Sequence, residues 1–441
     1  MAVETMAQPS LDINVHHITR LEGHGNLVIN VQDGTVEEAH FHIIEAPRLF
    51  EVMVKGHSYE ELHHMTSRIC GICAVSHTSA SLQATERALG IEISEQTRLL
   101  RLLAFHGEMA SSHVLHVYFL AAPDLLGTPS VVPLVQTHPD VVRRAMRLKK
   151  LFYDQCAVVL GRHTHPVAME PGGFSHFPTE KELVALKERL IAARADLEAT
   201  VELCQQLPLP DFARETEYVS LTDPHRYAFY EGDIKSSEGC VVPPEEYRAV
   251  TNEYVVPHST AKHARWHRDA YAVGALARFN NNHPQLHPKA REAAQALGLT
   301  APCTNPFMNN VAQVVETVHC IEDSIALIDT LLDKGVKPEK PVPPARLEGD
   351  GVGAVEAPRG ILFHHYVYEK GHCVKANCII PTAQNLGNID RDLRAFTPQL
   401  MATYYPDKET IRHKLEMLIR SYDPCISCSV HLLEVEFKEG H

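Results

Sequence analysis

Residues 68–73, RICGIC, and residues 423–428, DPCISC, are the stretches from which the rest of this 441-residue sequence can be interpreted. Each contains a Cys-x-x-Cys pair, and a histidine follows each pair, His77 after the first and His431 after the second. Two residues between the cysteines allow both thiolates to bind one metal ion. If the two pairs meet in space, their four sulfurs suit zinc, an iron–sulfur cluster, or nickel and iron, and exclude magnesium or calcium as the sulfur-bound ion.

The residues alone leave several interpretations of the paired cysteines open. A structural zinc clip is the common use of two such pairs, although a closed four-sulfur zinc site does not require a histidine near each pair. A thioredoxin-like dithiol would need only one of the pairs. The isolated cysteines are expected to be small buried hydrophobic residues, and they are Cys156, Cys204, Cys240, Cys303, Cys320 and Cys373.

Composition and charge restrict the class of protein. Lys and Arg together number 41 and Asp and Glu 55, so the net charge is −14, and 44% of the residues are hydrophobic. This is typical of an acidic globular protein and favours neither nucleic acid nor an anionic membrane surface as a partner. No apolar run reaches the roughly 18 residues of a membrane span, and the N-terminus lacks a secretion signal, so we expect a cytoplasmic protein with reduced thiols.

The hydrophobic pattern predicts a mainly α-helical fold with smaller β parts, in the α+β class. Residues 12–44 alternate around an Asp-Gly turn at 33–34 and predict a hairpin. Ser58 with Glu61, and Thr179 with Glu182, form capping boxes that predict helix starts. Helices are expected at about 94–121, ended by Pro123, and at 139–160, 179–206 and 307–334. Short strands are expected within 352–381, around a turn at 369–372, and a final helix from about 408.

We expect one large domain over residues 1–441, with a long-helix bundle as its core. It comprises a β part at 12–57, a helical core at 58–335, a Pro- and Gly-rich connector at 336–351, and a β part with a C-terminal metal-binding segment at 352–431. Residues 432–441 form a short tail that alternates apolar and charged residues.

Further motifs connect the cysteine pairs to a known family. They are R-L-E-G-H-G at 20–25, H-P-V-A followed by G-G-F within 165–174, Y-A-V-G-A-L-A-R at 271–278, and A-P-R-G at 357–360. With R-x-C-G-x-C-x-x-x-H and D-P-C-x-x-C-x-x-H, they extend in order over nearly the whole chain. The sequence thus resembles the large subunit of nickel-iron hydrogenases, in the soluble, group-three-like branch of sulfhydrogenases and NAD(P)-linked enzymes. The resemblance implies that subunit's fold and makes a zinc clip the weaker interpretation.

The resemblance assigns the paired cysteines to a nickel-iron centre. Cys70 and Cys425 would be terminal ligands of nickel, while Cys73 and Cys428 would bridge nickel to an iron that carries carbon monoxide and cyanide. His77 lies one helical turn after Cys73 and would reach the bridging sulfur as a hydrogen-bond donor.

Other residues would surround this centre. The resemblance implies that Arg359 stands over the open metal position and touches a cyanide, and that Asp423 helps to hold Arg359. A pocket around the diatomic ligands would be formed by Ala357, Pro358, Pro381 and Thr382. Their alternative interpretation is that they are ordinary turn and strand residues.

Proton transfer and a second metal complete the implied site. Glu22, in the motif at 20–25, resembles a proton gate next to the terminal cysteine, because a carboxylate can accept a proton and pass it outward. Glu51, His431 and the backbone carbonyl at or near Cys378 resemble ligands of a magnesium ion. Carboxylate and carbonyl oxygens suit this hard ion, although the histidine is atypical.

One helix departs from better-known members of the family. Where those carry His-Asp-His, this sequence has Ser111-Ser112-His113, so Ser112 is expected to replace an aspartate near the metal. This replacement puts the charge balance around Arg359 in doubt. His113 and His116 are expected to serve packing or a proton network rather than to bind metal.

The function implied is the interconversion of dihydrogen with two protons and two electrons. Cys425 or Arg359 would take the proton of a heterolytic split. Electrons would leave through a small subunit with iron–sulfur clusters, because the isolated cysteines contain no cluster motif, and then through flavin or iron–sulfur subunits. The acceptor would be NAD(P), deazaflavin or ferredoxin. The alternatives are a respiratory relative of the same fold, which lacks the paired cysteines, and a zinc-clipped scaffold protein.

The tail after His431 is expected to be removed. Family large subunits are commonly cut by a maturation protease just after the histidine of D-P-C-x-x-C-x-x-H, once nickel is in place. The mature chain would then end at His431 and lack LLEVEFKEGH, residues 432–441. The alternative is that the tail is a permanent edge strand.

Overall fold

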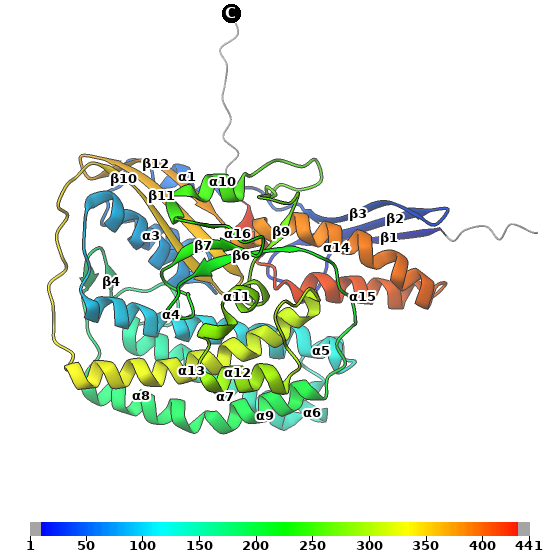
Figure 1. The fold of residues 1–441 in the computed structure, drawn as a ribbon, viewed down its shortest axis with the longest axis horizontal. Coiled ribbons are helices and arrows are strands. Elements are labelled where there is room, and N and C mark those ends of the chain that lie inside the picture. The colour runs from blue at the N-terminus through cyan, green and yellow to red at the C-terminus, as the bar shows by residue number, and fades with distance from the viewer. Residues whose placement is uncertain (1–9, 431–441) are drawn as a thin grey trace, which may run out of the picture.

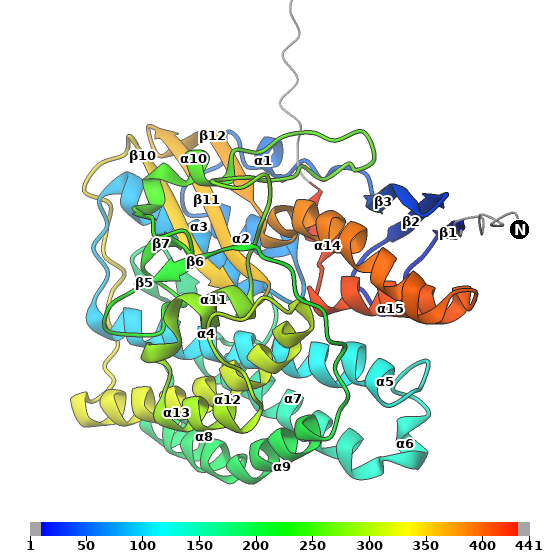
Figure 2. The ribbon, with the colours of Figure 1, turned by 45° about the vertical axis from the view of Figure 1, so that its right-hand side comes forward.

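The fold is known from a computed structural model that describes residues 10–430. A layer of helices runs along one side of the molecule and includes α4, α7, α8, α9, α12 and α13, and the sheets lie above it (Figure 1). The sheet of β1–β3 projects at one end together with α14 and α15, and a turned view shows the same arrangement (Figure 2). The predicted α+β class is confirmed.

The helices vary in length from one turn to seven. The α-helices are α1 (Phe50–Met53), α2 (Leu62–Thr66), α3 (Ala74–Leu89), α4 (Glu95–Leu115), α5 (Ala122–Leu125), α6 (Leu134–Thr137), α7 (Pro139–Leu160), α8 (Glu180–Ala192), α9 (Arg194–Gln205), α10 (Tyr247–Thr251), α11 (Ala275–Asn282), α12 (Pro288–Ala296), α13 (Asn309–Lys334), α14 (Pro381–Tyr404), α15 (Lys408–Ser421) and α16 (Ile426–Ser429). A π-helical segment, η2 (His116–Ala121), follows α4, and the 3₁₀ turns are η1 (Ser67–Ile69), η3 (Pro244–Glu246), η4 (His283–Gln285) and η5 (Pro306–Met308).

The strands form separate small sheets. They are β1 (Leu11–Val15), β2 (Gly25–Gln32), β3 (Thr35–Ile43), β4 (Met169–Glu170), β5 (Gly173–Phe174), β6 (Glu217–Thr222), β7 (Asp233–Ser236), β8 (Val241–Val242), β9 (Tyr271–Ala272), β10 (Gly349–Ala357), β11 (Gly360–Glu369) and β12 (His372–Ile379). The sheet orders are β1-β2-β3, β4-β5, β8-β7-β6-β9 and β10-β11-β12, and the only parallel pair among the described strands is β6 with β9.

Several elements begin and end where the sequence predicts. α7 starts with Pro139 and stops at Gly161, whose φ of 78° is open to glycine without strain. The capping box of Thr179 and Glu182 starts α8, and α13 ends at Gly335. The hairpin of β2 and β3 turns at the predicted Asp-Gly pair. Local signals of capping and turn chemistry were therefore sufficient for these elements.

Other expectations were wrong in detail. The helix predicted at 179–206 is two helices, α8 and α9, with a break at Ala193. Arg194, the first residue of α9, forms an ion pair with Glu322 of α13 that holds the chain in this new direction. Pro123 does not end the helical path after α4, because it occupies the first turn of α5, where no backbone N–H is needed. The turn of Ser58 and Glu61 precedes a helix that starts only at Leu62.

The C-terminal third differs most from the prediction. The strands of β10–β12 are eight to ten residues long rather than short, and the first begins at Gly349, inside the predicted connector. The helix α14 was not predicted, and neither was the sheet of β6–β9.

Helix α3 packs unusually close to strand β10. A side chain at Gly349, Gly351 or Gly353 would collide with a backbone carbonyl of the helix, that of Ala88, Ala84 or Ala80 respectively. Two strand residues rise about 6.7 Å and four helix residues about 6.0 Å, so the two series of small residues stay in step over three contacts. Because α3 follows Cys73 directly and β10 leads to Arg359, this contact relates two parts of the predicted metal centre.

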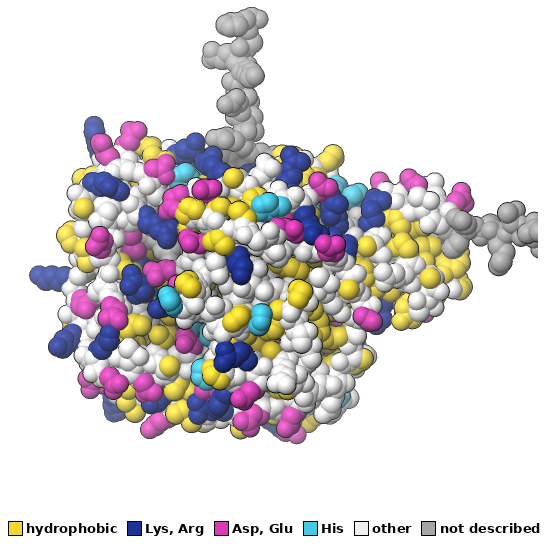
Figure 3. Space-filling model, in the orientation of Figure 1, with side chains coloured by type: hydrophobic (Ala, Val, Ile, Leu, Met, Phe, Trp, Pro, Cys, Tyr) yellow, Lys and Arg dark blue, Asp and Glu magenta, His cyan; other side chains and the backbone are white. Residues whose placement is uncertain are grey.

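The surface of the described part carries interspersed acidic and basic side chains (Figure 3). In that view hydrophobic atoms gather on the projecting end, where Figure 1 places the β1–β3 sheet and the far end of α15. Among the described residues, no helix combines the length and the apolar character that a membrane crossing requires.

Candidate metal centre

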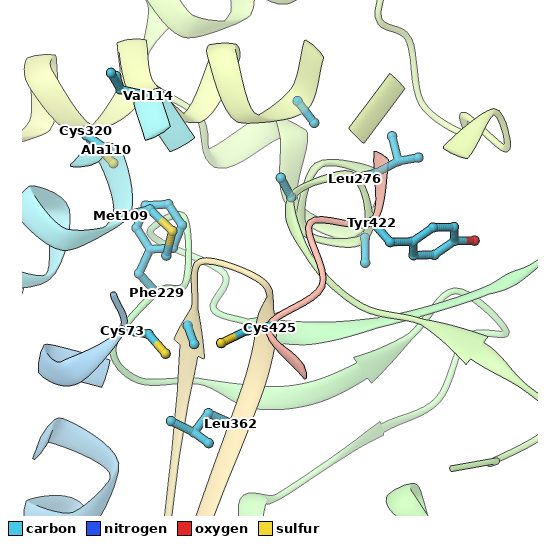
Figure 4. Packing of buried hydrophobic residues seen from close by; sticks show 14 of the residues in the cluster. Cys73, Met109, Ala110, Val114, Phe229, Leu276, Cys320, Leu362, Tyr422 and Cys425 are labelled. Atoms are coloured by element: carbon cyan, nitrogen blue, oxygen red, sulfur yellow. The ribbon is translucent and has the colours of Figure 1, made fainter. Parts of the chain in front are cut away.

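The four paired cysteines come from opposite ends of the sequence and meet in the interior. The sulfurs of Cys70 and Cys425 are 3.7 Å apart, those of Cys425 and Cys428 are 2.7 Å apart, and none is in a disulfide. The Cys73 sulfur, the Cys428 sulfur and a ring nitrogen of His77 also lie within 4.8 Å of one another. In Figure 4 the side chains of Cys73 and Cys425 point toward each other beside the β10–β11 turn. The predicted four-thiolate arrangement is therefore geometrically formed.

The first pair is held by its own backbone. The N–H groups of Ile72 and Cys73 donate to the Cys70 sulfur at 3.3 and 3.2 Å. A hydrogen bond from Cys425 lowers the pKa of the Cys70 thiol well below its usual value, and the charge of Arg359 acts in the same direction. Cys70 is therefore the cysteine whose surroundings favour a thiolate.

The helix that starts after this pair is capped from a distance. Glu108 of α4 accepts hydrogen bonds from the backbone N–H groups of Val75 and Ser76 and from the Ser76 hydroxyl. Burial raises the pKa of Glu108 to about 8, although these hydrogen bonds oppose the shift. Glu108 thereby satisfies first-turn donors of α3 that the helix itself cannot.

The second pair is held by distant segments. The backbone carbonyl of Glu22 accepts from Ile426, and its carboxylate accepts from the N–H of Ser427 at 3.1 Å and from the Ser427 hydroxyl. The N–H of Cys425 donates to the hydroxyl of Thr382 at 2.9 Å, which leaves the hydroxyl hydrogen available for another acceptor. Glu22 is partly buried, so its carboxylate connects this segment with the solvent side.

Arg359 is fixed at the turn between β10 and β11. Its Nε donates to the backbone carbonyl of Asp423 at 2.6 Å and its Nη2 to Asp423 Oδ1 at 2.9 Å. The backbone of Asp423 takes a left-handed φ of 51°, a conformation that costs free energy in residues other than glycine. In this conformation its backbone carbonyl and its Oδ1 both face the guanidinium. Burial favours the neutral guanidine, but the charges of Asp423 and of the cysteines outweigh it and raise the pKa of Arg359 well above its usual value.

One nitrogen of this guanidinium is unpaired. Arg359 Nη1 is buried and has no hydrogen-bond partner among the described residues. A buried donor without a partner is unfavourable unless another group accepts from it. Four converging sulfurs and a free buried donor beside them fit a nickel-iron centre with acceptor ligands, and a closed zinc site would need no such donor.

Comparisons with known proteins agree with this geometry. A family model described as nickel-dependent hydrogenase matches residues 48–139 and 215–431, and one described as HoxL-like matches residues 12–46. This chain belongs to the nickel-dependent hydrogenase family. It is 36% identical over 436 residues to the alpha subunit of sulfhydrogenase 1 from Pyrococcus furiosus, a match that covers 96% of this chain and 99% of the relative.

Another relative and a solved structure support the same assignment. The beta subunit of the NAD-reducing hydrogenase HoxS from Cupriavidus necator is 27% identical, over 94% of this chain and 94% of the relative. The structure of an NAD+-reducing NiFe-hydrogenase in the H2-reduced state has a TM-score of 0.85 at 27% identity, and the match covers 96% of this chain and 99% of the other. The chain is thus the catalytic large subunit of a nickel-iron hydrogenase, an oxidoreductase, and the family implies a nickel-iron centre bound by cysteines.

The hydrogenase holds the Arg359 turn with a residue to which the sequence assigned no role. Arg278, the last residue of the motif at 271–278, donates to the carbonyls of Ala357 and Pro358, each at 3.0 Å. Its guanidinium also pairs with Glu316 through two contacts of 2.7 Å and with Glu356 at 2.9 Å. The fully buried Arg278 therefore fixes the two predicted pocket residues before Arg359.

The charges around Arg278 are distributed unequally. Burial alone would raise the pKa of Glu316, but Arg278 holds it at about 2, so Glu316 carries the charge. Burial raises the pKa of Glu356 to about 7, because its single ion pair with Arg278 compensates less. Glu316, which follows two valines on the apolar face of α13, and Glu356, just before the A-P-R-G motif, were the sequence signals that could have identified this network.

Histidines continue the network on both sides of the centre. His77 Nδ1 is 3.1 Å from His364 Nε2, and His364 in turn hydrogen-bonds Tyr366 at 2.6 Å. His113 hydrogen-bonds Glu316 at 2.7 Å, and His116 hydrogen-bonds Gln313 at 2.6 Å.

The expected roles of these histidines stay predictions, which the contacts support. Gln313 donates to Asp423 Oδ2 at 3.1 Å, so His116 reaches Asp423 through one amide. The hydroxyl of Ser112, at the position of the replaced aspartate, is buried without a hydrogen-bond partner among the described residues. Asp423 is accordingly the carboxylate that pairs with Arg359.

The predicted magnesium ligands are only partly described. Glu51 on α1 is buried, and its charge adds to the effect of burial in raising the pKa of Cys378 on β12, so the two residues are neighbours. Glu51 also lines a cavity of about 340 Å³ together with the basic side chains of Lys55, Arg248, Lys262 and Lys375. His431, the third predicted ligand, lies outside the described residues, as does the tail at 432–441.

Proposed function

We propose that this large subunit catalyses the reversible oxidation of dihydrogen to two protons and two electrons. The observation that carries the proposal is the convergence of Cys70, Cys73, Cys425 and Cys428 beside a buried arginine, one nitrogen of which has no partner within residues 10–430. Cys70 and Cys425 would hold nickel as terminal ligands, and Cys73 and Cys428 would hold both nickel and an iron that carries carbon monoxide and cyanide. When bound, the centre supplies an open position at which dihydrogen is polarised and split.

The side chains around the centre orient its ligands and exclude water. Arg359 offers Nη1 to a cyanide or to the reacting molecule, and Asp423 keeps the guanidinium in place. Thr382 retains a hydroxyl hydrogen for a diatomic ligand, while Ala357, Pro358 and Pro381 close the pocket with apolar atoms. His77 donates to a bridging sulfur and is oriented by His364.

Protons move outward from the second cysteine pair. Cys425 or Arg359 takes the proton of the split, and Glu22 accepts it and passes it toward solvent. Support comes from the isolated bridge between Glu22 and Cys425 and from the contact of the Glu22 carboxylate with Ser427, two residues from the sulfur. A carboxylate in this place acts as general base in one direction and general acid in the other.

Electrons leave through partner subunits. Relatives named as alpha and beta subunits belong to multi-subunit hydrogenases, which supports two kinds of partner for this chain. One is a small iron–sulfur subunit, and the others are further flavin or iron–sulfur subunits. The acceptor is a soluble carrier, NAD(P), deazaflavin or ferredoxin, and the complex is cytoplasmic.

A magnesium ion and a maturation step complete the proposal. Glu51, the carbonyl near Cys378 and His431 would hold the ion, since carboxylate and carbonyl oxygens are the ligands that magnesium prefers. A maturation protease removes residues 432–441 after nickel insertion. The intact mass of the active large subunit is expected to correspond to a chain that ends at His431. A full-length chain in active, nickel-loaded enzyme would contradict the proposed cleavage.

Infrared spectroscopy of the purified complex tests the central proposal. Bands of metal-bound carbon monoxide and cyanide, with one nickel and one iron per large subunit, are the expected result, together with isotope exchange of dihydrogen. Zinc in place of nickel and iron, without these bands, would overturn it.

A further inference from the structure

Two histidines and an aspartate, side-chain types that can bind metal, lie together where the projecting β1–β3 sheet meets α14. His40 is on β3, Asp390 is on α14, and His258 is in the segment between α10 and β9. Figures 1 and 2 both show β3 beside α14 at this end of the molecule. The hydrogenase chemistry uses none of these residues, so their arrangement needs a separate explanation.

The spacing of the three side chains is that of ligands to one ion. His40 Nδ1 and His258 Nε2 lie 3.2 and 2.9 Å from the same oxygen, Oδ2 of Asp390. The two ring nitrogens and a carboxylate oxygen all lie within 4.8 Å of one another. Ligands of a tetrahedral zinc ion, with bonds of about 2.0 to 2.1 Å, are about 3.3 Å apart.

The surroundings orient the carboxylate toward the histidines. The backbone N–H of Phe41 donates to Asp390 Oδ1 at 2.8 Å, which leaves Oδ2 for the imidazoles. Proteins usually orient a metal ligand by a hydrogen bond to the polar atom of that side chain that does not bind the metal, which here is Oδ1 of Asp390. The rings of His40 and His258 are stacked with centroids 4.1 Å apart, so both present an edge to the same oxygen.

Two further histidines, His42 and His263, lie beside the three side chains. The centroid of the His42 ring lies 5.4 Å from that of the His258 ring. The centroid of the His263 ring lies 5.5 Å from that of the His258 ring. His263 is almost fully buried, and its Nε2 has no hydrogen-bond partner among the described residues.

We propose that His40, His258 and Asp390 bind a zinc ion, with water in the fourth position and the Nε2 of His263 next to it. Two imidazoles and a carboxylate are ligands that zinc binds readily, and they differ from the thiolates of the catalytic centre. The ion connects three segments that lie more than 100 residues apart in sequence. Its effect is to stabilise the attachment of the β1–β3 sheet to α14.

Zinc binding to the purified hydrogenase complex tests this site. After dialysis against a chelator, the wild-type complex is expected to bind one more zinc ion per large subunit than the His258→Ala complex, whose affinity is at least tenfold lower. His176→Ala, which removes an exposed histidine elsewhere, should bind zinc like the wild type. X-ray absorption at the zinc edge should show nitrogen and oxygen ligands, and zinc should raise the melting temperature of the wild type and of His176→Ala but not of His258→Ala.

Two conservative variants keep the test decisive if the alanine variant folds poorly. His258→Gln and Asp390→Asn preserve most of the side-chain volume and should also lose the extra zinc, while the infrared bands of the catalytic centre stay unchanged. Equal zinc content in wild type and in all three variants of the site, or an edge spectrum with sulfur ligands, would overturn the proposal.

Discussion

The two cysteine pairs are held in place by opposite means. Cys70 and Cys73 precede a long buried helix, and the backbone N–H groups that contact Cys70 come from the next residues in the chain. Cys425 directly precedes a one-turn helix, α16, and Cys428 lies within it, and the contacts of this segment come from residues such as Glu22 and Thr382, far away in sequence. The first pair belongs to the framework, whereas the second is docked onto it.

This difference has a consequence for assembly. A docked segment can adopt its place after the framework has folded, and its stability depends on contacts that single substitutions can remove. Substitutions near the second pair should therefore affect the metal centre more than the fold, and those near the first pair should affect the fold as well.

The largest expected effect separates the metal from the fold. Cys425→Ser should abolish nickel binding and hydrogen–deuterium exchange, while circular dichroism and the melting temperature remain near those of the wild-type protein without metal. The reason is that the helical core does not depend on the docked segment. Cys156→Ser on α7, a buried cysteine remote from the pair in sequence and without a ligand role, is the matched control and should retain nickel. Appreciable isotope exchange by Cys425→Ser would disprove the terminal-ligand assignment.

The next effect tests whether Glu22 moves protons or only holds the docked segment. Glu22→Gln preserves the shape but cannot shuttle a proton, so turnover and isotope exchange should fall by about 100-fold or more with normal infrared bands. Ser427→Ala removes the hydroxyl that donates to Glu22 and leaves the carboxylate intact, so its loss of turnover should be much smaller. Equal losses in the two variants would make Glu22 a positioning residue.

A smaller effect concerns the guanidinium between the two pairs. Arg359→Lys keeps the charge but loses the planar fork that contacts the backbone carbonyl and Oδ1 of Asp423, so turnover should fall at least tenfold, about 1.4 kcal/mol of barrier. Nickel content measured in the same sample should not change. A lysine variant with full turnover would show that a point charge is sufficient.

The smallest effect is a pH dependence of the framework around the first pair. The pKa of Glu108 is about 8 in the folded protein and about 4.5 when unfolded. Between these two pKa values the folded state binds a proton that the unfolded state has lost, so the free energy of unfolding falls as the pH rises. Above about pH 8 both states have lost the proton, and the free energy of unfolding no longer changes through this group. Glu108→Gln removes this titration.

Melting curves of wild type and Glu108→Gln, recorded from pH 4.5 to 9, measure that slope. The melting temperature of the variant relative to the wild type should increase with pH up to about 8, whatever constant offset the lost hydrogen bonds cause. Parallel curves would mean that Glu108 is ionised in the folded protein at neutral pH.

The sequence predicted those parts of the molecule whose signals are local. A few neighbouring residues are enough to recognise the cysteine pairs, the capping box of Thr179 and the glycine that ends α13. The motif that contains Arg359 was sufficient to name the residue and its neighbours.

The parts that were missed depend on distant partners. Helix α14 turns a polar face inward, with Gln384, Asn385 and Asn388 hydrogen-bonded to other elements, so its hydrophobic period is weak. Arg278 lies in a recognised motif, but its role follows only from Glu316 and Glu356, 38 and 78 residues further on. Such pairings cannot be obtained from one sequence without the fold.

The glycine and alanine contact between β10 and α3 sets a dimension of the catalytic centre. One end of the helix is Cys73 and one end of the strand leads to Arg359, so the distance between backbones determines how far a sulfur stands from a guanidinium. Because backbone meets backbone, no rotation of a side chain can absorb an added methyl group. Substitutions at residues 349–353 would thus shift the active-site residues relative to one another, although residues 349–353 contact no metal. In directed evolution of this enzyme, such substitutions would lower its activity.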